Sequence, residues 1–219
     1  MAHGKFISFE GGEGAGKSTQ SQLLCRRLET FGVETLATRE PGGSAGAEEI
    51  RALLVSGQVE RWDPLTEALL HNAARHDHVQ RTILPALERG IWVITDRFLD
   101  STLAYQGYGQ GVDLDKLNHL AELAAGAAIP DLTLILDLPV AEGFARTEQR
   151  ADGASRYEQM DRAMHERLRG GFLRIAESDA ARCRVIDATP KADSVHEAIW
   201  QAVQQRFDVE LKSSDMGRG

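Results

Sequence analysis

Short apolar runs alternate with longer amphipathic segments along this chain. The short runs have the length and composition of buried strands, and they span residues 5–10, 33–37, 91–95, 132–138 and 184–187. The longer segments repeat apolar residues at helical spacing, and they span residues 18–31, 47–55, 65–89, 114–125, 140–150, 157–177 and 194–207. Strands separated by helices predict right-handed βαβ units and a mostly parallel sheet.

The expected architecture is an α/β fold in which a five-stranded parallel sheet carries helices on both faces. No internal repeat or change of composition divides residues 1–211, which we expect to form a single domain. Residues 212–219 lack periodicity and are expected to form a disordered tail. A small polar break at 152–155 (DGAS) has arginines on both sides, so we expect a mobile lid at about 146–157.

The composition excludes several classes of protein. With 219 residues, 42% of them hydrophobic and 26% charged, the chain can bury a core and remain soluble. No apolar run is long enough for a membrane-spanning helix, and the first residues enter an apolar strand directly, so we do not expect a secretory signal. The net charge of −8 argues against nucleic-acid binding. Cys25 and Cys183 form no disulfide framework, which fits a reducing compartment. We therefore expect a cytoplasmic protein without nucleic-acid or membrane partners.

Residues 11–18 (GGEGAGKS) match the phosphate-binding pattern G-x-x-x-x-G-K-[ST], and they lie between a predicted strand and a predicted helix. Glycines let successive backbone N–H groups point inward around an anion, and the helix N-terminus adds partial positive charge. Lys17 is expected to contact the β- and γ-phosphates, and Ser18 to ligate Mg²⁺. The predicted nucleotide-binding residues are Gly11, Gly12, Glu13, Gly14, Ala15, Gly16, Lys17, Ser18 and Thr19.

This loop occurs in GTPases, ATPases and small-molecule kinases, so it does not name the substrate. The sequence contains no Asn-Lys-x-Asp motif for guanine, and a small phosphotransferase is favoured. Asp96 ends an apolar strand, where it would hold Mg²⁺, although a helix N-cap is the alternative. Arg39 and Arg97 also follow strands and could clamp a substrate phosphate. For Arg39, a structural pair with a glutamate remains equally open.

Three strings carry a specific resemblance: FEGGEGAGKST, TREPGG and DRFLDSTLAYQG. In their order and spacing the chain resembles bacterial thymidylate kinases over about residues 4 to 207. The resemblance implies a three-layer P-loop NTPase fold and Mg²⁺-dependent transfer of the ATP γ-phosphoryl group to dTMP, which yields dTDP and ADP for dTTP synthesis. It also implies a homodimer, for which the helical face at 65–89 is a candidate.

The resemblance also implies roles for individual residues. Glu13 would lie near the 3′-hydroxyl and phosphate of the acceptor, and Arg39 and Arg97 would bind the dTMP phosphate. The remaining implied substrate residues are Arg75 at the thymine carbonyl, Thr102 and Gln106 at the base edge, Tyr105 against the ribose 2′ position, and Ser101 in the same site.

His71 departs from the resemblance, because family members usually have an aromatic residue there, commonly Phe, that stacks on thymine. An imidazole stacks more weakly and carries a pH-dependent charge, and a helix-surface histidine is the alternative. This departure keeps open a kinase for another acceptor such as dUMP. A nucleotide-binding switch without turnover is the other alternative, against which Lys17, Asp96 and the lid arginines argue.

Phosphoryl transfer needs positive charge around the equatorial oxygens of the migrating group. Positions 12–15 of the loop contain no arginine, so a cation besides Lys17 must come from elsewhere. By resemblance we expect lid arginines to supply it, Arg156 first and Arg150 second, while a solvated helix end is the alternative. The expected catalytic residues are Lys17, Glu13, Arg97, Arg150 and Arg156, and the expected metal ligands are Ser18 and Asp96.

Overall fold

A computed structural model describes residues 3–148, 156–157 and 160–207. Its strands are β1 (Phe6–Glu10), β2 (Thr35–Arg39), β3 (Trp92–Asp96), β4 (Leu132–Asp137) and β5 (Cys183–Asp187). Its α-helices are α1 (Lys17–Thr30), α2 (Ala45–Val55), α3 (Pro64–His78), α4 (Leu84–Glu88), α5 (Leu99–Thr102), α6 (Leu114–Ala125), α7 (Val140–Glu148), α8 (Arg162–Ser178) and α9 (Ala192–Phe207). A 3₁₀ turn, η1 (Val59–Arg61), and two π-helical segments, η2 (Val79–Ile83) and η3 (Leu103–Gly109), complete the described elements.

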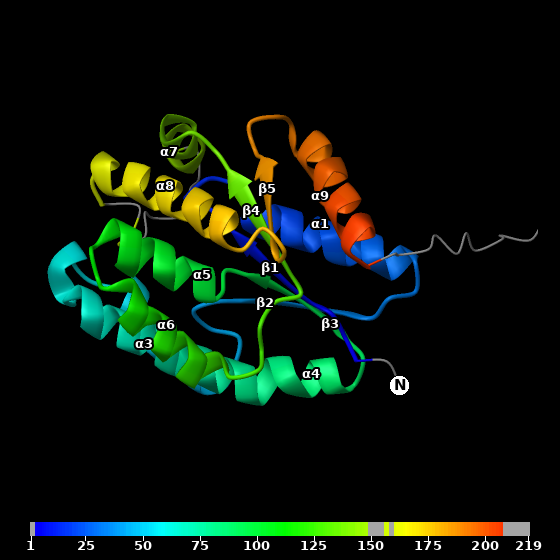
Figure 1. The fold of residues 1–219 in the computed structure, drawn as a ribbon, viewed down its shortest axis with the longest axis horizontal. Coiled ribbons are helices and arrows are strands. Elements are labelled where there is room, and N and C mark those ends of the chain that lie inside the picture. The colour runs from blue at the N-terminus through cyan, green and yellow to red at the C-terminus, as the bar shows by residue number, and fades with distance from the viewer. Residues whose placement is uncertain (1–2, 149–155, 158–159, 208–219) are drawn as a thin grey trace, which may run out of the picture.

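The five strands form one parallel sheet in the order β2-β3-β1-β4-β5. Helices α1 and α9 cover one face, and the layer that contains α3, α4 and α8 covers the other (Figure 1). This arrangement confirms the predicted three-layer α/β fold with a five-stranded parallel sheet. The strand order places β1 at the centre, so the loop that follows it is flanked on both sides.

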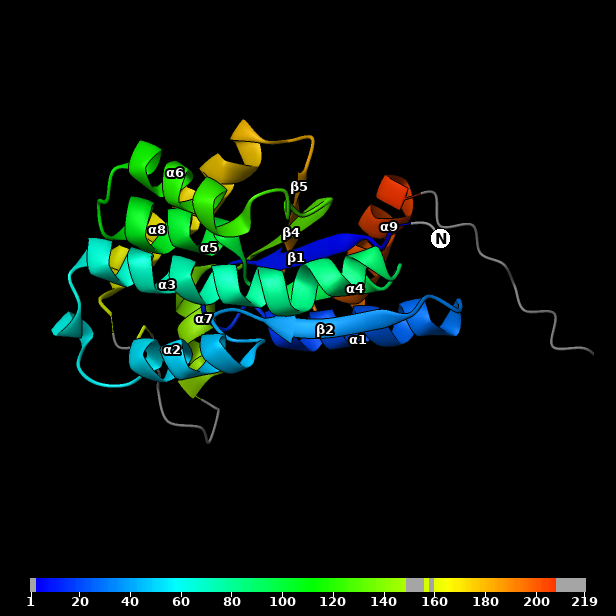
Figure 2. The same ribbon diagram turned by 90° about the horizontal axis from the view of Figure 1, so that it is seen from below.

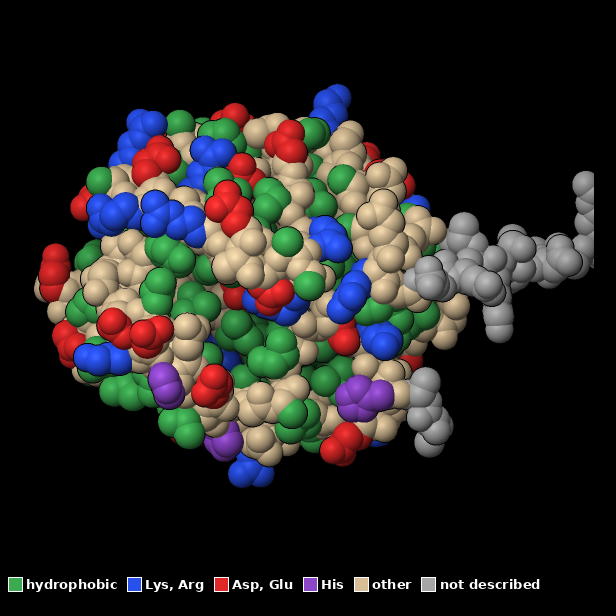
Figure 3. Space-filling model, viewed as in Figure 1, with side chains coloured by type: hydrophobic (Ala, Val, Ile, Leu, Met, Phe, Trp, Pro, Cys, Tyr) green, Lys and Arg blue, Asp and Glu red, His purple; other side chains and the backbone are tan. Residues whose placement is uncertain are grey.

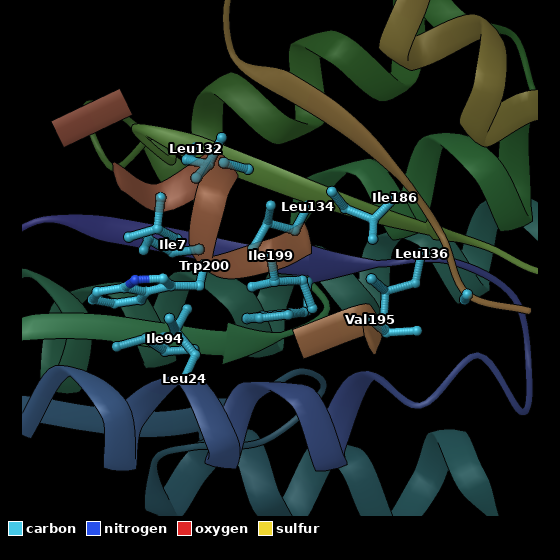
Figure 4. Close-up of a cluster of buried hydrophobic side chains, with 14 of the residues drawn as sticks. Ile7, Leu24, Ile94, Leu132, Leu134, Leu136, Ile186, Val195, Ile199 and Trp200 are labelled. Carbon is cyan, nitrogen blue, oxygen red and sulfur yellow. The ribbon is translucent and has the colours of Figure 1, made fainter. Parts of the chain in front are cut away.

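Alternation along the central strand divides the core between the two faces. Ile7 and Phe9 pack with Leu24 of α1 and Trp200 of α9, whereas Phe6 packs on the opposite face. Figure 4 shows the first of these clusters, in which Ile7, Leu134 and Ile199 lie together between sheet and helices. Burial on both faces is the reason why these strands are nearly continuously apolar.

The register brings the carboxyl ends of three strands together. Asp96 of β3 is opposite both Phe9 of β1 and Arg39 of β2, and β2 ends on the side of the molecule where α2 lies (Figure 2). Ligands of open α/β sheets bind beyond the carboxyl ends of the strands. The predicted phosphate loop, Arg39 and Asp96 therefore share one edge of the sheet.

Several predicted boundaries were wrong. The second strand spans 35–39 instead of 33–37. The predicted helix 65–89 is interrupted by a π-helical segment at 79–83, which lies between α3 and α4. Pro85 explains that segment, because it has no N–H to donate and its ring crowds the carbonyl four residues earlier.

The helix predicted over 157–177 begins only at Arg162 of α8. Asp161 caps it, since its carboxylate accepts from the N–H of Met164 at 2.6 Å. Tyr157 therefore precedes the helix. The sequence also did not predict α5 and η3, which follow β3. The end of the helix predicted over 140–150, most of the predicted lid and the tail 212–219 lie outside the described residues.

Positive and negative side chains are interspersed on the face shown in Figure 3. Within the part of the chain that the structure describes, no helix has the length and hydropathy required to cross a bilayer. Cys25 and Cys183 are buried free thiols.

Candidate active site

The loop between β1 and α1 has the backbone of an anion cradle. Gly11, Gly14 and Gly16 all have positive φ angles, of 133°, 71° and 89°. At Gly14 a side chain is also excluded sterically, because a Cβ would lie 2.4 Å from the carbonyl oxygen of Gly143 in α7. The loop is thus shaped by glycine conformations that other residues rarely adopt. Its last residue, Gly16, directly precedes the first turn of α1.

Lys17 is folded back over this loop. Its Nζ donates to the carbonyl oxygens of Gly11 at 3.1 Å and Gly12 at 2.7 Å. Burial, together with the neighbouring Arg97, lowers the pKa of Lys17 to about 8. The ammonium group therefore lies on the loop itself, as the sequence pattern indicates.

Ser18 and Asp96 form a pair of oxygen ligands beside the loop. The hydroxyl of Ser18 donates directly to Oδ2 of Asp96, although 78 residues separate them. Mg²⁺ prefers hard oxygen ligands, commonly one or two carboxylates completed by water and phosphate. A hydroxyl and a carboxylate in contact fit that preference, so this pair is suited to hold Mg²⁺.

Glu13 connects the phosphate loop to the neighbouring cavity. Its Oε1 accepts from Nη2 of Arg97 at 2.8 Å and from the hydroxyl of Tyr105 at 2.6 Å. Burial opposes ionisation of Glu13, but Arg97 and Lys17 outweigh it and lower its pKa to about 2. Burial, in contrast, raises the pKa of Tyr105 well above its usual value. Glu13 is therefore an anion held between two cations and a neutral phenol.

A cavity opens beside Glu13, and it brings together most of the predicted acceptor residues. Its lining includes the predicted Glu13, His71, Arg97, Ser101, Thr102, Tyr105 and Gln106. It also includes residues that the sequence did not predict, namely Glu40, Pro41, Arg51, Val55 and Tyr157. Glu40 and Pro41 belong to the quoted TREPGG string, which was the available signal. Nothing local singles out Arg51 within its helix.

Glu10, another residue that the sequence did not predict, supports the floor of this cavity. Its two oxygens accept from the N–H of Phe98 at 2.8 Å and from the hydroxyl of Ser101 at 2.6 Å. Burial, with a contribution from Asp100, raises the pKa of Glu10 to about 8. Glu10 thus holds the segment after β3, in which Arg97 has a φ of 69°.

Arg75 lies behind the cavity, within a buried network. Its nitrogens donate to Glu40 at 2.8 Å, Asn72 at 3.0 Å, Phe98 at 3.0 Å and Thr102 at 3.2 Å. These bonds use four of the roughly five N–H groups of a guanidinium. Arg75 is 2% exposed and is not among the residues that line the cavity, so its contact with a ligand stays a prediction.

His71 lines the cavity, and its stacking on a base stays a prediction. Its Nε2 is 2.8 Å from the hydroxyl of Tyr157. Burial, with the charges of Arg75 and Arg156, lowers the pKa of His71 to about 3. The imidazole is therefore neutral at physiological pH.

Arg156 lies against α3 and η1. Its Nε donates to the carbonyl oxygen of Leu54 at 3.2 Å, its Nη1 to that of Val59 at 2.9 Å, and its Nη2 to Oε2 of Glu67. The residue is 1% exposed. None of these partners belongs to the phosphate loop. Arg150 lies outside the described residues.

Arg39 forms the glutamate pair that the sequence left open. Its Nη2 is 3.0 Å from both carboxylate oxygens of Glu48, and both side chains are largely exposed. It lines a shallow groove that also contains Ser18 and Asp96, instead of the cavity beside Glu13.

A second groove adjoins the opposite side of the phosphate loop. It is lined by Gly14, Ala15, Gly16 and Thr19 of the predicted set, and by Arg146 and Lys191, among others. Arg146 is held there because its Nη2 donates to the carbonyl oxygens of Ala188 at 3.1 Å and Thr189 at 3.3 Å. Two grooves with basic side chains therefore flank one anion-binding loop.

Comparisons with known proteins agree with this geometry. A family model for thymidylate kinase matches residues 9–199. Thymidylate kinase from Caulobacter vibrioides is 53% identical over 207 residues, which cover 94% of this chain and 99% of that protein. Thymidylate kinase from Afipia carboxidovorans is 51% identical over 206 residues, which cover 93% and 90%.

The fold is also found in a solved structure. The crystal structure of thymidylate kinase from Ehrlichia chaffeensis matches with a TM-score of 0.76 at 37% sequence identity. The match covers 92% of this chain and 99% of that one.

Proposed function

Because the chain belongs to the thymidylate kinase family and has thymidylate kinase activity, we propose that it transfers the γ-phosphoryl group of ATP to dTMP with the help of Mg²⁺. The products are dTDP and ADP. The attacking oxygen belongs to the dTMP phosphate, which is largely ionised at pH 7, so the transfer demands no strong general base. The work of the protein is positioning and charge stabilisation.

The phosphate loop holds the donor in this proposal. The backbone N–H groups of residues 11–19 surround the β-phosphate, and Lys17 neutralises charge on the β- and γ-phosphates. Ser18 and Asp96, which touch in the structure, hold Mg²⁺, and the metal supplies further positive charge to the phosphates. The adenine side of ATP takes the groove that contains Arg146 and Lys191.

One observation carries the assignment of the acceptor: Glu13 of the phosphate loop contacts both Arg97 and Tyr105 of the cavity. Donor loop and acceptor cavity therefore meet at one side chain. Arg97 binds the dTMP phosphate, with Arg51 as a second cation in the same lining. Tyr105 lies against the sugar. Arg39 joins the phosphate contacts only if it leaves Glu48.

The inner end of the cavity takes the base. Neutral His71 stacks on thymine, Arg75 offers its remaining N–H to a carbonyl, and Thr102 and Gln106 face the base edge. Ser101 and Glu10 support the phosphate end, where Arg97 donates to the Ser101 hydroxyl at 3.3 Å. Because the imidazole stays neutral, stacking on the base does not require a charged ring, which the sequence left open.

Phosphoryl transfer needs a second cation, besides Lys17, at the migrating phosphoryl group. The proposed sources are the lid arginines, Arg156 first and Arg150 second, on the sequence alone. Arg156 donates to Glu67, to two backbone carbonyls and to the hydroxyl of Tyr157, so it would have to leave these partners to reach the phosphoryl group.

We also propose a homodimer through α3 and α6. These helices pack together, and they carry apolar side chains that are unusually exposed, with Leu69 49% and Leu123 78% accessible. Such a face fits a second copy of the chain. Analytical ultracentrifugation of the wild type and of Leu123→Glu tests this: a monomer–dimer shift supports the interface, and a monomeric wild type contradicts it.

The acceptor assignment is tested by Arg97→Ala, with the exposed Arg89→Ala as the matched control. An ADP-release assay is run with dTMP, dUMP, UMP, CMP, AMP and GMP. We expect the wild type to prefer dTMP, and Arg97→Ala to lower kcat/KM for dTMP by roughly 10²-fold or more. Binding of ATP, followed by calorimetry, should remain unchanged. Equal loss of ATP and dTMP binding would contradict the assignment of Arg97 to the acceptor.

A further inference from the structure

Glu67 is a buried carboxylate that the proposed mechanism does not use. It lies on α3, one turn before His71, and its side chain is 1% exposed. Oε2 accepts from Arg156, whose side chain is equally buried. Oε1 accepts from Nε2 of Gln106 at 2.6 Å and, at 3.3 Å, from Nε2 of Gln110. A buried ion pair therefore directs one of its oxygens at a residue of the base cavity.

This contact fixes the orientation of the Gln106 amide. An ionised carboxylate only accepts hydrogen bonds, so the amide must present its NH₂ group to Glu67, because a flipped amide would bring two acceptors together. Gln106 lines the cavity and Glu67 does not. The amide nitrogen is thus turned away from the cavity, and the carbonyl oxygen is the group that Gln106 can offer to a ligand.

We propose that Glu67 is the residue that positions Gln106 for base recognition, with Arg156 as its buried ion-pair partner. The inference rests on the proposed dTMP site. The carbonyl oxygen of Gln106 accepts from the N3–H of thymine. The N3 atom of cytosine carries no hydrogen and is itself an acceptor. It would therefore face the carbonyl oxygen of Gln106 without a hydrogen bond between them. A site that leaves polar groups unpaired rejects the wrong ligand strongly.

Uracil makes this proposal testable, because it shares the N3–H and O4 edge of thymine and lacks only the methyl group. The ratio of kcat/KM for dTMP to that for dCMP therefore reports the orientation of Gln106. The ratio for dTMP to dUMP does not report it. A general loss of structure would lower activity toward all three nucleotides together.

The variant is Glu67→Met combined with Arg156→Met, which removes both buried charges and leaves neither unpaired. The matched control is the exposed Glu60→Gln. Without Glu67 the amide can rotate and offer its NH₂ to cytosine. We expect the dTMP/dCMP ratio to fall roughly tenfold or more, the size of one hydrogen bond to a ligand, while the dTMP/dUMP ratio is unchanged. Dissociation constants from calorimetry provide the same ratios without turnover.

Two results would overturn the inference: an unchanged dTMP/dCMP ratio, or an equal change in both ratios. If the double variant does not fold, Gln106→Leu replaces it, and weaker binding of dTMP and dUMP with unchanged binding of dCMP is then expected. Equal weakening of all three by Gln106→Leu also overturns the inference. The wild type separates this outcome from the underlying assignment, because a wild type that fails to prefer dTMP to dCMP contradicts the proposed dTMP site itself.

Discussion

The phosphate loop and the base cavity are built in opposite ways. The loop is one continuous stretch whose shape comes from glycine backbone conformations and from the start of α1. The cavity is assembled from the phosphate loop, the segments after β2 and β3, α2, α3 and Tyr157. Buried ionic and polar contacts such as Glu67–Arg156 and Glu40–Arg75 hold these parts together. The phosphate loop is formed by residues that are adjacent in sequence, whereas the base cavity is formed mainly by residues that are distant in sequence.

This difference predicts how substitutions in each region affect binding and folding stability. Substitution of Lys17 removes charge from the donor side, and Lys17 does not line the neighbouring cavity. A substitution in the cavity leaves a buried partner without its counter-ion or hydrogen bond, so it affects binding and folding stability together. Variants can therefore be designed that separate the two regions.

The largest effect on activity is expected from Lys17→Met, which should impair only the function of the phosphate loop. It removes a cation that stabilises the migrating phosphoryl group, so kcat should fall roughly 10³-fold. Calorimetric dTMP binding should stay close to that of the wild type. The exposed Lys116→Met is the control. A large loss of dTMP binding in Lys17→Met would show that the two regions are not separable.

An intermediate effect is expected from His71→Phe, which should change how the free energy of unfolding depends on pH. The pKa of His71 is about 3 in the fold and 6.5 in the unfolded chain. The unfolded state therefore binds the extra proton, and the free energy of unfolding decreases as the pH falls below 6.5. By about pH 5 this loss is about 2 kcal/mol, at ~1.36 kcal/mol per pH unit.

Replacement by Phe removes that loss, so the stability difference between wild type and His71→Phe should change by about 2 kcal/mol between pH 7.5 and about pH 5. Urea unfolding at both pH values measures it. The lost hydrogen bond to Tyr157 adds a contribution that does not depend on pH and cancels in this comparison. A difference that stays constant with pH would show that His71 titrates normally in the fold.

The smallest effect is expected at the exposed pair Arg39–Glu48, which lines the groove that also contains Ser18 and Asp96. Glu48→Gln should change the free energy of unfolding by less than about 1 kcal/mol. If Arg39 binds the dTMP phosphate, Glu48→Gln frees it and lowers the KM for dTMP, whereas Arg39→Ala raises that KM, each by less than about fivefold. The exposed Arg81→Ala is the control. An unchanged KM in Arg39→Ala would make the pair purely structural.

The local region could be predicted in detail from the sequence. Spacing alone placed Lys17 and Ser18 in the loop, and alternating strands and helices gave the five-stranded parallel sheet. Asp96, which the sequence places at a strand end, lies beside Ser18, and its role as a Mg²⁺ ligand stays a prediction. These features depend on backbone conformation and on short-range patterns, which a sequence displays directly.

The tertiary region could be predicted only in part, because its contacts join distant segments. Gly107 and Gly109 suggest a break in helix, yet they lie within η3. A Cβ at Gly107 would lie 2.6 Å from Cδ2 of Leu114 in α6, so the leucine side chain would have to move to admit a larger residue. Likewise, no local signal indicates that Arg156 and Glu67, 89 residues apart, form a buried pair. Asp161 was a readable N-cap signal that the helix prediction overlooked.

The left-handed backbone of Arg97 has a consequence for attempts to stabilise this enzyme by directed evolution. A non-glycine residue at a φ of 69° costs roughly 1 kcal/mol or more relative to glycine. Arg97→Gly would relieve that strain, but it would also leave the largely buried carboxylate of Glu13 without the guanidinium that it contacts at 2.8 Å. Loss of a buried counter-ion costs more than about 1 kcal/mol of backbone strain. The ion pair therefore stabilises the strained conformation, and a library aimed at heat resistance should keep Arg97 fixed.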